Sequence, residues 1–256
     1  MAIIETDTPT TSSDPHLRGD FTVLRVCLFA SVAYAGFGLA GFAGFAGFWP
    51  PPGPDLTAAE IAAFFRDNET HLKIGMTLMA ICGPFYYVWS AVVSKIVSRM
   101  EGPMGILSTV ELLGGLLTGI VTFTPAVLWL TAAFRADTHP DTTIQMLYDY
   151  GWFFFDMTFV CSGLQQVALG VAILRDDRAV PLLPRWVAWI ALVSAGSYLS
   201  LTMVPYFHTG PFAWAGLLSF WVVFVGFFAM VACVTATGWT ALKRIEREML
   251  GEPLVT

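Results

Sequence analysis

The sequence predicts an all-α, polytopic membrane protein with six transmembrane helices and a short interfacial helix after the first. Charged residues make up only 12% of the chain, about half the share found in soluble domains, and hydrophobic residues make up 56%. Six stretches reach the length of about 20 apolar residues that a helix needs to cross a bilayer. So little charge cannot cover a soluble domain, and a net charge of −6 excludes a nucleic-acid-binding surface.

The predicted transmembrane helices cover 21–48, 72–96, 105–133, 149–174, 185–205 and 212–240. Helices are expected because backbone groups in lipid must bond internally, and no alternating strand pattern repeats along the chain. The polar, acidic residues 1–20 predict a disordered cytoplasmic tail, and residues 241–256 are expected to form a cytoplasmic C-terminal tail. The six-helix transmembrane domain is therefore expected to occupy 21–240.

A short helix is predicted between the first and second transmembrane helices. Residues 49–54 (WPPPGP) contain too much proline for a helix, but Asp55 or Thr57 can cap one that starts directly afterwards. Glu60 follows Thr57 at the spacing of a capping box. Three apolar residues then share one side of the helix: Ile61, Phe64 and Phe65. This pattern predicts a helix that rests on the membrane surface.

The distribution of Lys and Arg predicts the orientation in the membrane. Six transmembrane helices place both termini on one side, and cytoplasmic loops are enriched in basic residues. The side of the termini collects most of them: Arg18, Arg25, Lys95, Arg99, Arg175, Arg178, Arg185, Lys243, Arg244 and Arg247. The opposite side holds only Arg66, Lys73 and Arg135. Both termini are therefore expected in the cytoplasm.

Two rows of small residues are expected to mediate helix packing. Gly36, Ala40 and Gly44 form a small-xxx-small row in the first transmembrane helix, and Gly115 and Gly119 form a GxxxG pair in the third. Such rows let a neighbouring backbone approach closely. The glycine-rich first helix can also provide the face for a partner in a membrane complex or a homo-oligomer.

Arg25 and Glu111 are charged residues at a similar predicted depth, near the cytoplasmic ends of the first and third transmembrane helices. Buried charges need partners, so we expect a structural Arg25–Glu111 ion pair. A proton-relay or substrate-binding role for Glu111 is the alternative.

Asp156 is the strongest candidate for a ligand-binding residue. It lies in the segment WFFFDMTF, about two turns below the predicted outer surface, where no basic residue occurs. Polar and small residues form a stripe on each of the third and fourth transmembrane helices, which predicts a cavity that opens outward between them. Thr122 and Gln166 belong to these stripes, and His208 lies on the same outer side. The structural alternative is an Asp156 that only bonds to a Thr or a backbone carbonyl.

The histidines offer little evidence for a metal site. His71, His139 and His208 all map to the outer side, and imidazole suits zinc and copper. No HxxxH, HExxH or HxH pair is present, so the spacing does not support a site. We therefore predict no cofactor, and zinc or copper on these histidines is the weakest of the candidates. No catalytic residue is assigned.

Several segments are similar to a known group of sequences: GFGLAGFAGFAGFWPPP, LTAAEIAAFFRDN, WLTAAFRAD, LPRWVAWI and HTGPFAWAGLLSFW. Together they resemble a family of six-span membrane proteins from actinobacteria, such as mycobacteria, and some proteobacteria. The resemblance implies a location in the bacterial inner membrane. It assigns no activity, cofactor or catalytic residue.

The function expected from the sequence is non-enzymatic binding, passage or handling of a lipophilic small molecule. An interior rich in Phe, Met and Trp with few polar anchors is typical of small-molecule pockets. One alternative is a membrane-embedded enzyme for a lipid-like or isoprenoid substrate, with Asp156 as general acid or a metal on the outer histidines. The other is a structural subunit of a membrane complex.

Overall fold

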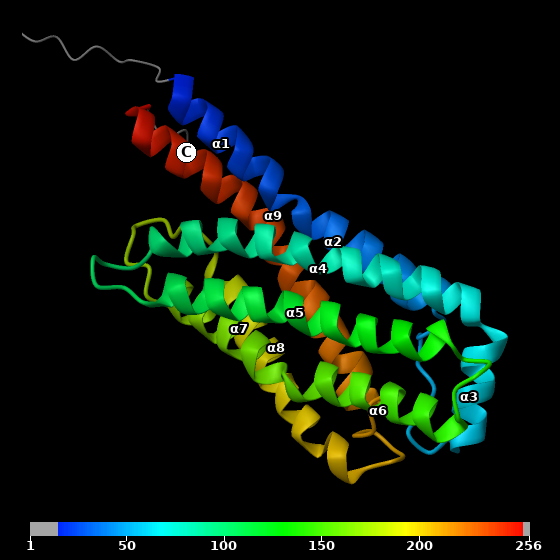
Figure 1. The fold of residues 1–256 in the computed structure, drawn as a ribbon. Helices are drawn as coiled ribbons and strands as arrows, with labels where there is room; N and C mark the ends of the chain where they lie inside the picture. Colours follow the sequence, from blue (N-terminus) through cyan, green and yellow to red (C-terminus); the bar gives the residue numbers. More distant parts are fainter. Residues whose placement is uncertain (1–14, 253–256) are drawn as a thin grey trace, which may run out of the picture.

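The computed structural model describes residues 15–252, and every regular element in that range is helical (Figure 1). Six segments are long and apolar enough to cross a membrane, and we term them candidate spans 1 to 6: Pro15–Phe45, Glu69–Ser98, Leu107–Phe134, Asp141–Leu174, Arg185–Tyr206 and Leu217–Leu250. Each overlaps one of the predicted stretches. The prediction of an all-helical chain with six such helices is therefore confirmed for the described residues.

The spans differ in regularity. Spans 2 and 3 are single helices, α4 (Glu69–Ser98) and α5 (Leu107–Phe134). The other four are composite. Span 1 contains α1 (Pro15–Leu28), α2 (Ala30–Leu39) and the π-helical η1 (Ala40–Phe45), and span 4 contains α6 (Asp141–Met157) and α7 (Phe159–Leu174). Span 5 contains α8 (Arg185–Ser197) and the 3₁₀-helical η2 (Tyr198–Tyr206). Span 6 contains the π-helical η3 (Leu217–Val222) and α9 (Val223–Leu250).

The first and last helices extend beyond the predicted boundaries. Helix α1 begins at Pro15, so residues 15–20 of the predicted disordered tail are helical, while residues 1–14 lie outside the described range. Helix α9 continues to Leu250, through most of the predicted C-terminal tail. Figure 1 shows the two helices side by side where they project from the bundle. An Arg18–Glu252 ion pair of 2.7 Å joins the ends, which explains why both helices continue into polar sequence.

The end of the bundle that carries α1 and the end of α9 is termed the terminal end, and the opposite end, with α3 (Ala58–Asp67), is the distal end. The predicted cap of α3 is present at Thr57. The Thr57 Oγ1 accepts a bond of 3.4 Å from the Glu60 N–H, and a Glu60 carboxylate oxygen accepts one of 2.8 Å from the Thr57 N–H. The capping-box prediction is therefore confirmed.

The apolar side of α3 is covered by protein, which corrects the expectation that this side rests on a membrane surface. Ile61 and Phe65 are buried, and the Phe65 ring lies 5.6 Å from that of Tyr148 on α6. Arg66 adds polar anchors, with bonds of 2.9 Å to the Ala136 carbonyl and 2.7 Å to the Asp141 carboxylate. Sequence periodicity identifies the apolar side of a helix, but not whether lipid or protein covers it.

Helices α4 and α5 approach closely through glycine, as the GxxxG pair predicts. A Cβ atom at Gly119 would lie 2.9 Å from the Gly83 carbonyl oxygen and would collide with the Tyr87 ring. A Cβ atom at Gly115 would collide with the Ser90 side chain. Gly115 and Gly119 are therefore confirmed as packing positions.

The small-residue row of span 1 does not pack inside the bundle. Gly36, Ala40 and Gly44 are exposed, and a Cβ atom at Gly36 would meet nothing within 4 Å. Gly41 makes the close approach instead: a Cβ atom there would collide with the Gly75 carbonyl oxygen of α4. Span 1 has small residues on several faces, so composition alone does not identify the face that meets α4.

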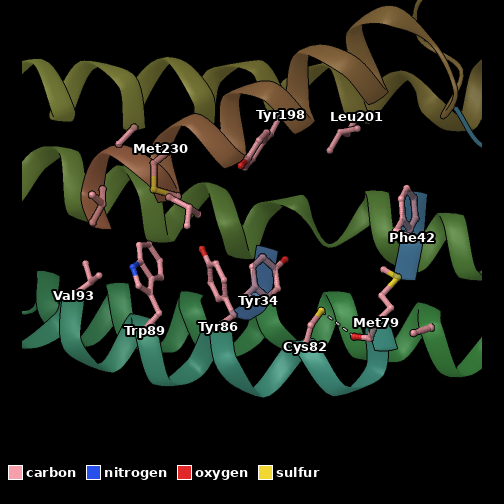
Figure 2. Close-up of a cluster of buried hydrophobic side chains, with 14 of the residues drawn as sticks. Tyr34, Phe42, Met79, Cys82, Tyr86, Trp89, Val93, Tyr198, Leu201 and Met230 are labelled. Atoms are coloured by element: carbon pink, nitrogen blue, oxygen red, sulfur yellow. Dashed lines mark hydrogen bonds between the residues drawn. The ribbon is translucent and has the colours of Figure 1, made fainter. Parts of the chain in front are cut away.

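One part of the core lies between α4 and the fifth and sixth spans. Figure 2 shows Met79, Cys82, Tyr86 and Trp89 in a row along α4, all of them buried. Tyr34 of α2 joins this row, with its ring 5.0 Å from that of Tyr86. Tyr198 and Leu201 of η2 project toward them from the opposite side of the bundle (Figure 2). The space between these groups contains the candidate site.

Candidate functional site

A cavity of about 90 Å³ lies inside the bundle, with walls from spans 1, 3, 4, 5 and 6. Its polar lining residues are Tyr34, Thr118, Thr122, Asp156, Ser162, Tyr198 and Ser219. The rest of the wall is apolar, and five of its side chains are phenylalanines: Phe155, Phe159, Phe224, Phe227 and Phe228. Among the described residues that line it, Asp156 is the only acid, and there is no Lys or Arg.

Asp156 is buried without a hydrogen-bond partner. The residue is 3% exposed, and its Oδ2 atom contacts no donor in the described part of the chain. A break in span 4 follows directly: α6 ends at Met157, and the Thr158 hydroxyl donates a bond of 2.6 Å to the Phe154 carbonyl. A buried polar group without a partner costs free energy. Glu111 also has one unpartnered oxygen, Oε2, but its Oε1 accepts two hydrogen bonds, whereas the Asp156 carboxyl accepts none from the described residues.

Non-α segments border the cavity on three sides. The break at Thr158 lies in span 4, Tyr198 and Leu201 belong to the 3₁₀-helical η2, and Ser219 belongs to the π-helical η3. Departures from α geometry are frequent at functional sites because they re-aim side chains and free backbone groups. Pro84 and Pro125, by contrast, lie inside α4 and α5 without ending either helix.

Thr122 lines the same cavity as Asp156, so the structure brings together two of the four candidate ligand-binding residues. The Thr122 hydroxyl lies 3.0 Å from the Tyr34 hydroxyl, and the two groups share a hydrogen bond. This bond joins α2 to α5 and fixes the Tyr34 ring at the cavity wall. Sequence reasoning missed Tyr34, although it is the only tyrosine in the first predicted span.

Gln166 and His208 do not line the cavity. The Gln166 Nε2 donates a bond of 2.6 Å to the Tyr198 hydroxyl, so Gln166 holds a lining residue in place rather than facing a ligand itself. His208 is exposed on the loop between η2 and η3. Its expected place at the site is therefore wrong, because the long η2 carries the chain past the cavity before His208 is reached.

A second cavity of about 40 Å³ adjoins the first between α2, α4 and α9. The two cavities share five lining residues: Tyr34, Thr122, Phe155, Phe224 and Phe228. Phe224 and Phe228 are only partly buried, so the side of the cavities formed by α9 is thin. Rotation of these two rings would join the cavities into one elongated space.

A layer of aromatic rings packs against the lining residues Phe155 and Phe224, and it comprises Phe42, Trp129, Trp152 and Phe220. Trp129 and Trp152 are fully buried, and their ring centres lie 5.1 Å apart. The proline-rich loop covers this layer, because the Pro52 carbonyl accepts bonds from the Tyr148 hydroxyl and the Trp214 indole. The third and fourth candidate spans both line the cavity, as expected, and the outward opening between them stays a prediction.

The expected Arg25–Glu111 ion pair is also wrong. Arg25 pairs with Glu246 of α9, because α1 lies along α9 at the terminal end. Glu111 is fully buried and accepts bonds of 3.0 Å from the Ser90 hydroxyl and 2.9 Å from the Gln165 amide. The Gln165 carbonyl oxygen in turn accepts a bond of 2.9 Å from the Tyr86 hydroxyl. Glu111 therefore belongs to a hydrogen-bonded network between α4, α5 and α7.

His71, His139 and His208 do not form a cluster. In residues 15–252, no three His, Cys, Asp or Glu side chains gather in a way that could hold a metal ion. The three histidines lie on α4, on the loop after α5 and on the loop after η2.

No protein-family model, curated protein or solved structure matches this chain. The family resemblance therefore stays a prediction. Among the described residues, fold and site together define a helical bundle with six candidate spans and a largely apolar cavity whose lining includes one acid without a hydrogen-bond partner.

Proposed function

We propose that this chain is an integral membrane protein of the bacterial inner membrane that binds a lipophilic small molecule in the cavity beside Asp156. It crosses the membrane six times with both termini in the cytoplasm, and binding involves no chemical change of the ligand. Large apolar side chains on the outside of the bundle support the membrane location: Val193 is 70% exposed, Val225 is 67% and Val32 is 61%. Exposed apolar surface of this kind is expected where lipid replaces water.

The observation that carries the proposal is Asp156. Burial of an acid costs free energy unless hydrogen bonds or a cation compensate. Glu111 has two donors, and the equally buried Asp176 accepts a bond of 2.8 Å from the Leu182 N–H. Asp156 has no such partner and faces open space, which is expected of a group that meets a ligand.

The size of the cavity limits the ligand. About 90 Å³ is less than the ~300 Å³ or more of pockets that hold drug-sized molecules. The ligand is therefore small, or part of it enters the adjoining space of about 40 Å³ after Phe224 and Phe228 rotate. The proposal predicts binding of fragment-sized apolar compounds.

Thermal unfolding of the purified, full-length protein in detergent tests this function, because a ligand of the folded state raises the unfolding temperature. The probes are toluene, indole and cyclohexanol. Leu201→Trp fills the cavity and should abolish the stabilisation by these compounds. Leu199→Trp is the matched control, since Leu199 lies on the same η2 but is 66% exposed.

Failure of all three probes to stabilise the wild-type protein would contradict the proposal. An unchanged response in folded L201W would contradict it as well. If L201W does not fold, Phe227→Ala provides the second test: it enlarges the cavity and should strengthen the response to indole, the largest probe.

Reporter fusions at residues 104 and 138 test the topology, with the first expected in the cytoplasm and the second outside.

The two alternatives also make distinct predictions. Turnover of an added lipid-like or isoprenoid compound, lost in Asp156→Asn, would favour a membrane enzyme. The structural-subunit alternative draws support from the exposed row Gly36, Ala40 and Gly44, which suits close approach of a second copy. It predicts that Gly36→Ile and Gly44→Ile reduce a dimer to monomers in detergent without loss of ligand binding.

A further inference from the structure

We propose that the cavity selects an organic ammonium cation, which the Asp156 carboxylate and the surrounding aromatic rings hold together. The inference rests on the proposed function and narrows its ligand class from lipophilic molecules in general to small cations with an apolar surface. Charge, wall chemistry and size each contribute to it.

The charge balance of the cavity is one-sided. Asp156 has a buried Oδ2 atom with no donor in the described part of the chain, and the other titratable groups on the described wall are the hydroxyls of Tyr34 and Tyr198. No Lys or Arg among the described residues lines the space. A buried carboxylate gains most from an opposite charge that is desolvated with it. The group that completes this site is therefore a cation from outside the chain.

Aromatic rings form much of the remaining wall. On the α9 side, the ring centres of Phe227 and Phe228 are 5.3 Å apart and their planes are nearly perpendicular. Tyr34 lies 6.1 Å from Phe227 and 6.5 Å from Phe228, and Tyr198 lines the wall from η2. Rings from α2, η2 and α9 therefore pack on one another and line the same space. Ring faces attract ammonium groups within about 6 Å, and quaternary ammonium ions are typically bound in such aromatic cages.

The hydroxyl groups of the cage are engaged elsewhere. The Tyr34 hydroxyl bonds to Thr122 at 3.0 Å, and the Tyr198 hydroxyl accepts a bond from Gln166 at 2.6 Å. These bonds fix the two rings and leave their apolar surfaces as the wall. A quaternary ammonium ion needs no hydrogen bond, so it suits a wall of rings and one carboxylate better than a polar neutral ligand does.

The volume favours a small head group. An apolar cavity of roughly 150 Å³ accepts benzene, so about 90 Å³ suits a compact group such as trimethylammonium, whereas rings such as toluene or indole also need the adjoining space. A short chain attached to it can enter the adjoining space beside Gly38 and Leu39 of α2.

The experiment compares choline with 3,3-dimethylbutan-1-ol, which has the same shape but carries carbon in place of the charged nitrogen. Titration calorimetry on the full-length protein in nanodiscs should show at least tenfold tighter binding of choline. Asp156→Asn should abolish this preference, so that choline and the alcohol bind with equal affinity. Glu111→Gln is the matched control and should keep the preference, because Glu111 is buried outside the cavity on Ser90 and Gln165.

Two results overturn the inference: equal affinity of the wild-type protein for both compounds, or a choline preference that persists in folded D156N. If D156N does not fold, Phe228→Leu provides the test. Loss of one ring should weaken choline binding about fivefold and binding of the alcohol only little. Equal weakening of both would count against a cation cage. If toluene stabilises the protein but choline does not bind, only the inference of a cationic ligand is refuted. Absence of binding by every probe refutes the proposed function itself.

Discussion

The structure contains two buried carboxyl groups in different surroundings. Glu111, in the half of the bundle nearer the termini, accepts hydrogen bonds from Ser90 and Gln165 and lies where glycines let α4 and α5 approach closely. Asp156, in the distal half, has an Oδ2 atom with no partner and faces a cavity between composite spans. The Glu111 carboxyl receives two hydrogen bonds on its Oε1 atom and none on Oε2, whereas the Asp156 carboxyl receives none from the described residues.

The two regions also differ in how tightly their helices pack. The regular helices α4 and α5 meet along Gly83, Gly115 and Gly119, where no further atom fits. Around Asp156, a helix break, a 3₁₀ segment and a π segment leave room instead. We therefore expect substitutions in the first region to lower stability and substitutions in the second to change binding.

The largest expected effect is on the α4–α5 contact. Gly119→Leu places a side chain against the Gly83 carbonyl and the Tyr87 ring, so the free energy of unfolding should fall by about 3 kcal/mol or more. Gly36→Leu is the control, since nothing lies within 4 Å of its Cβ position. Equal unfolding temperatures for the two variants in detergent would show that the close approach does not stabilise the bundle.

The two carboxyl groups themselves provide the next comparison. Glu111→Ala leaves the Ser90 hydroxyl and the Gln165 amide without their acceptor, which should cost about 1–3 kcal/mol. Asp156→Ala removes a group without a donor, so its stability should be unchanged or higher. Denaturant unfolding of both variants measures the difference. A larger loss in D156A than in E111A would reverse the roles assigned to the two residues.

A double-mutant cycle tests the partner of Arg25. The Arg25 and Glu246 side chains are 21% and 14% exposed, so their coupling should be about 0.5–1 kcal/mol. The Arg25–Glu111 cycle should give additive losses, because Glu111 bonds to other residues. Coupling to Glu111 rather than to Glu246 would restore the pair that the sequence suggests.

The smallest effect concerns α3, outside the candidate spans. Hydrogen bonds from the Thr57 N–H and hydroxyl groups lower the pKa of the Glu60 carboxyl. The ionised group therefore contributes stability above its unfolded-state pKa, and this contribution disappears as the pH falls through the lowered value. Hydrogen-exchange protection of the first turn of α3 should decrease on acidification in the wild-type protein. Glu60→Gln should remove this pH dependence, and an identical profile for both proteins would contradict it.

Some features of the fold and site follow from local sequence. Apolar length predicts the six candidate spans, and the Thr57–Glu60 spacing predicts the start of α3 within a residue. Gly115 and Gly119 were predicted to pack, and Asp156 and Thr122 were predicted to share a site. All but the last of these predictions depend on residues within one helix or on the spacing along it, and the shared site of Asp156 and Thr122 followed from polar stripes on two helices.

Other features depend on which helices become neighbours. The partner of Arg25 is 221 positions away in sequence, and the donors to Glu111 come from α4 and α7. Small residues occur on more than one face of span 1, but only one face meets α4. That face carries the packed Gly41, whereas the row of Gly36, Ala40 and Gly44 is exposed. No proline marks the break at Thr158, while Pro84 and Pro125 lie inside unbroken helices.

The sequence by itself determined the helical class, the number and length of the candidate spans and the scarcity of charge that makes Asp156 conspicuous. Hydropathy and helix capping are local properties, so no tertiary information is needed for them. The tertiary structure alone decided that Asp156 lacks a partner and that rings from α2, η2 and α9 line the same cavity. Those facts arise from side chains on five separate spans, which only the packing of the bundle brings within contact.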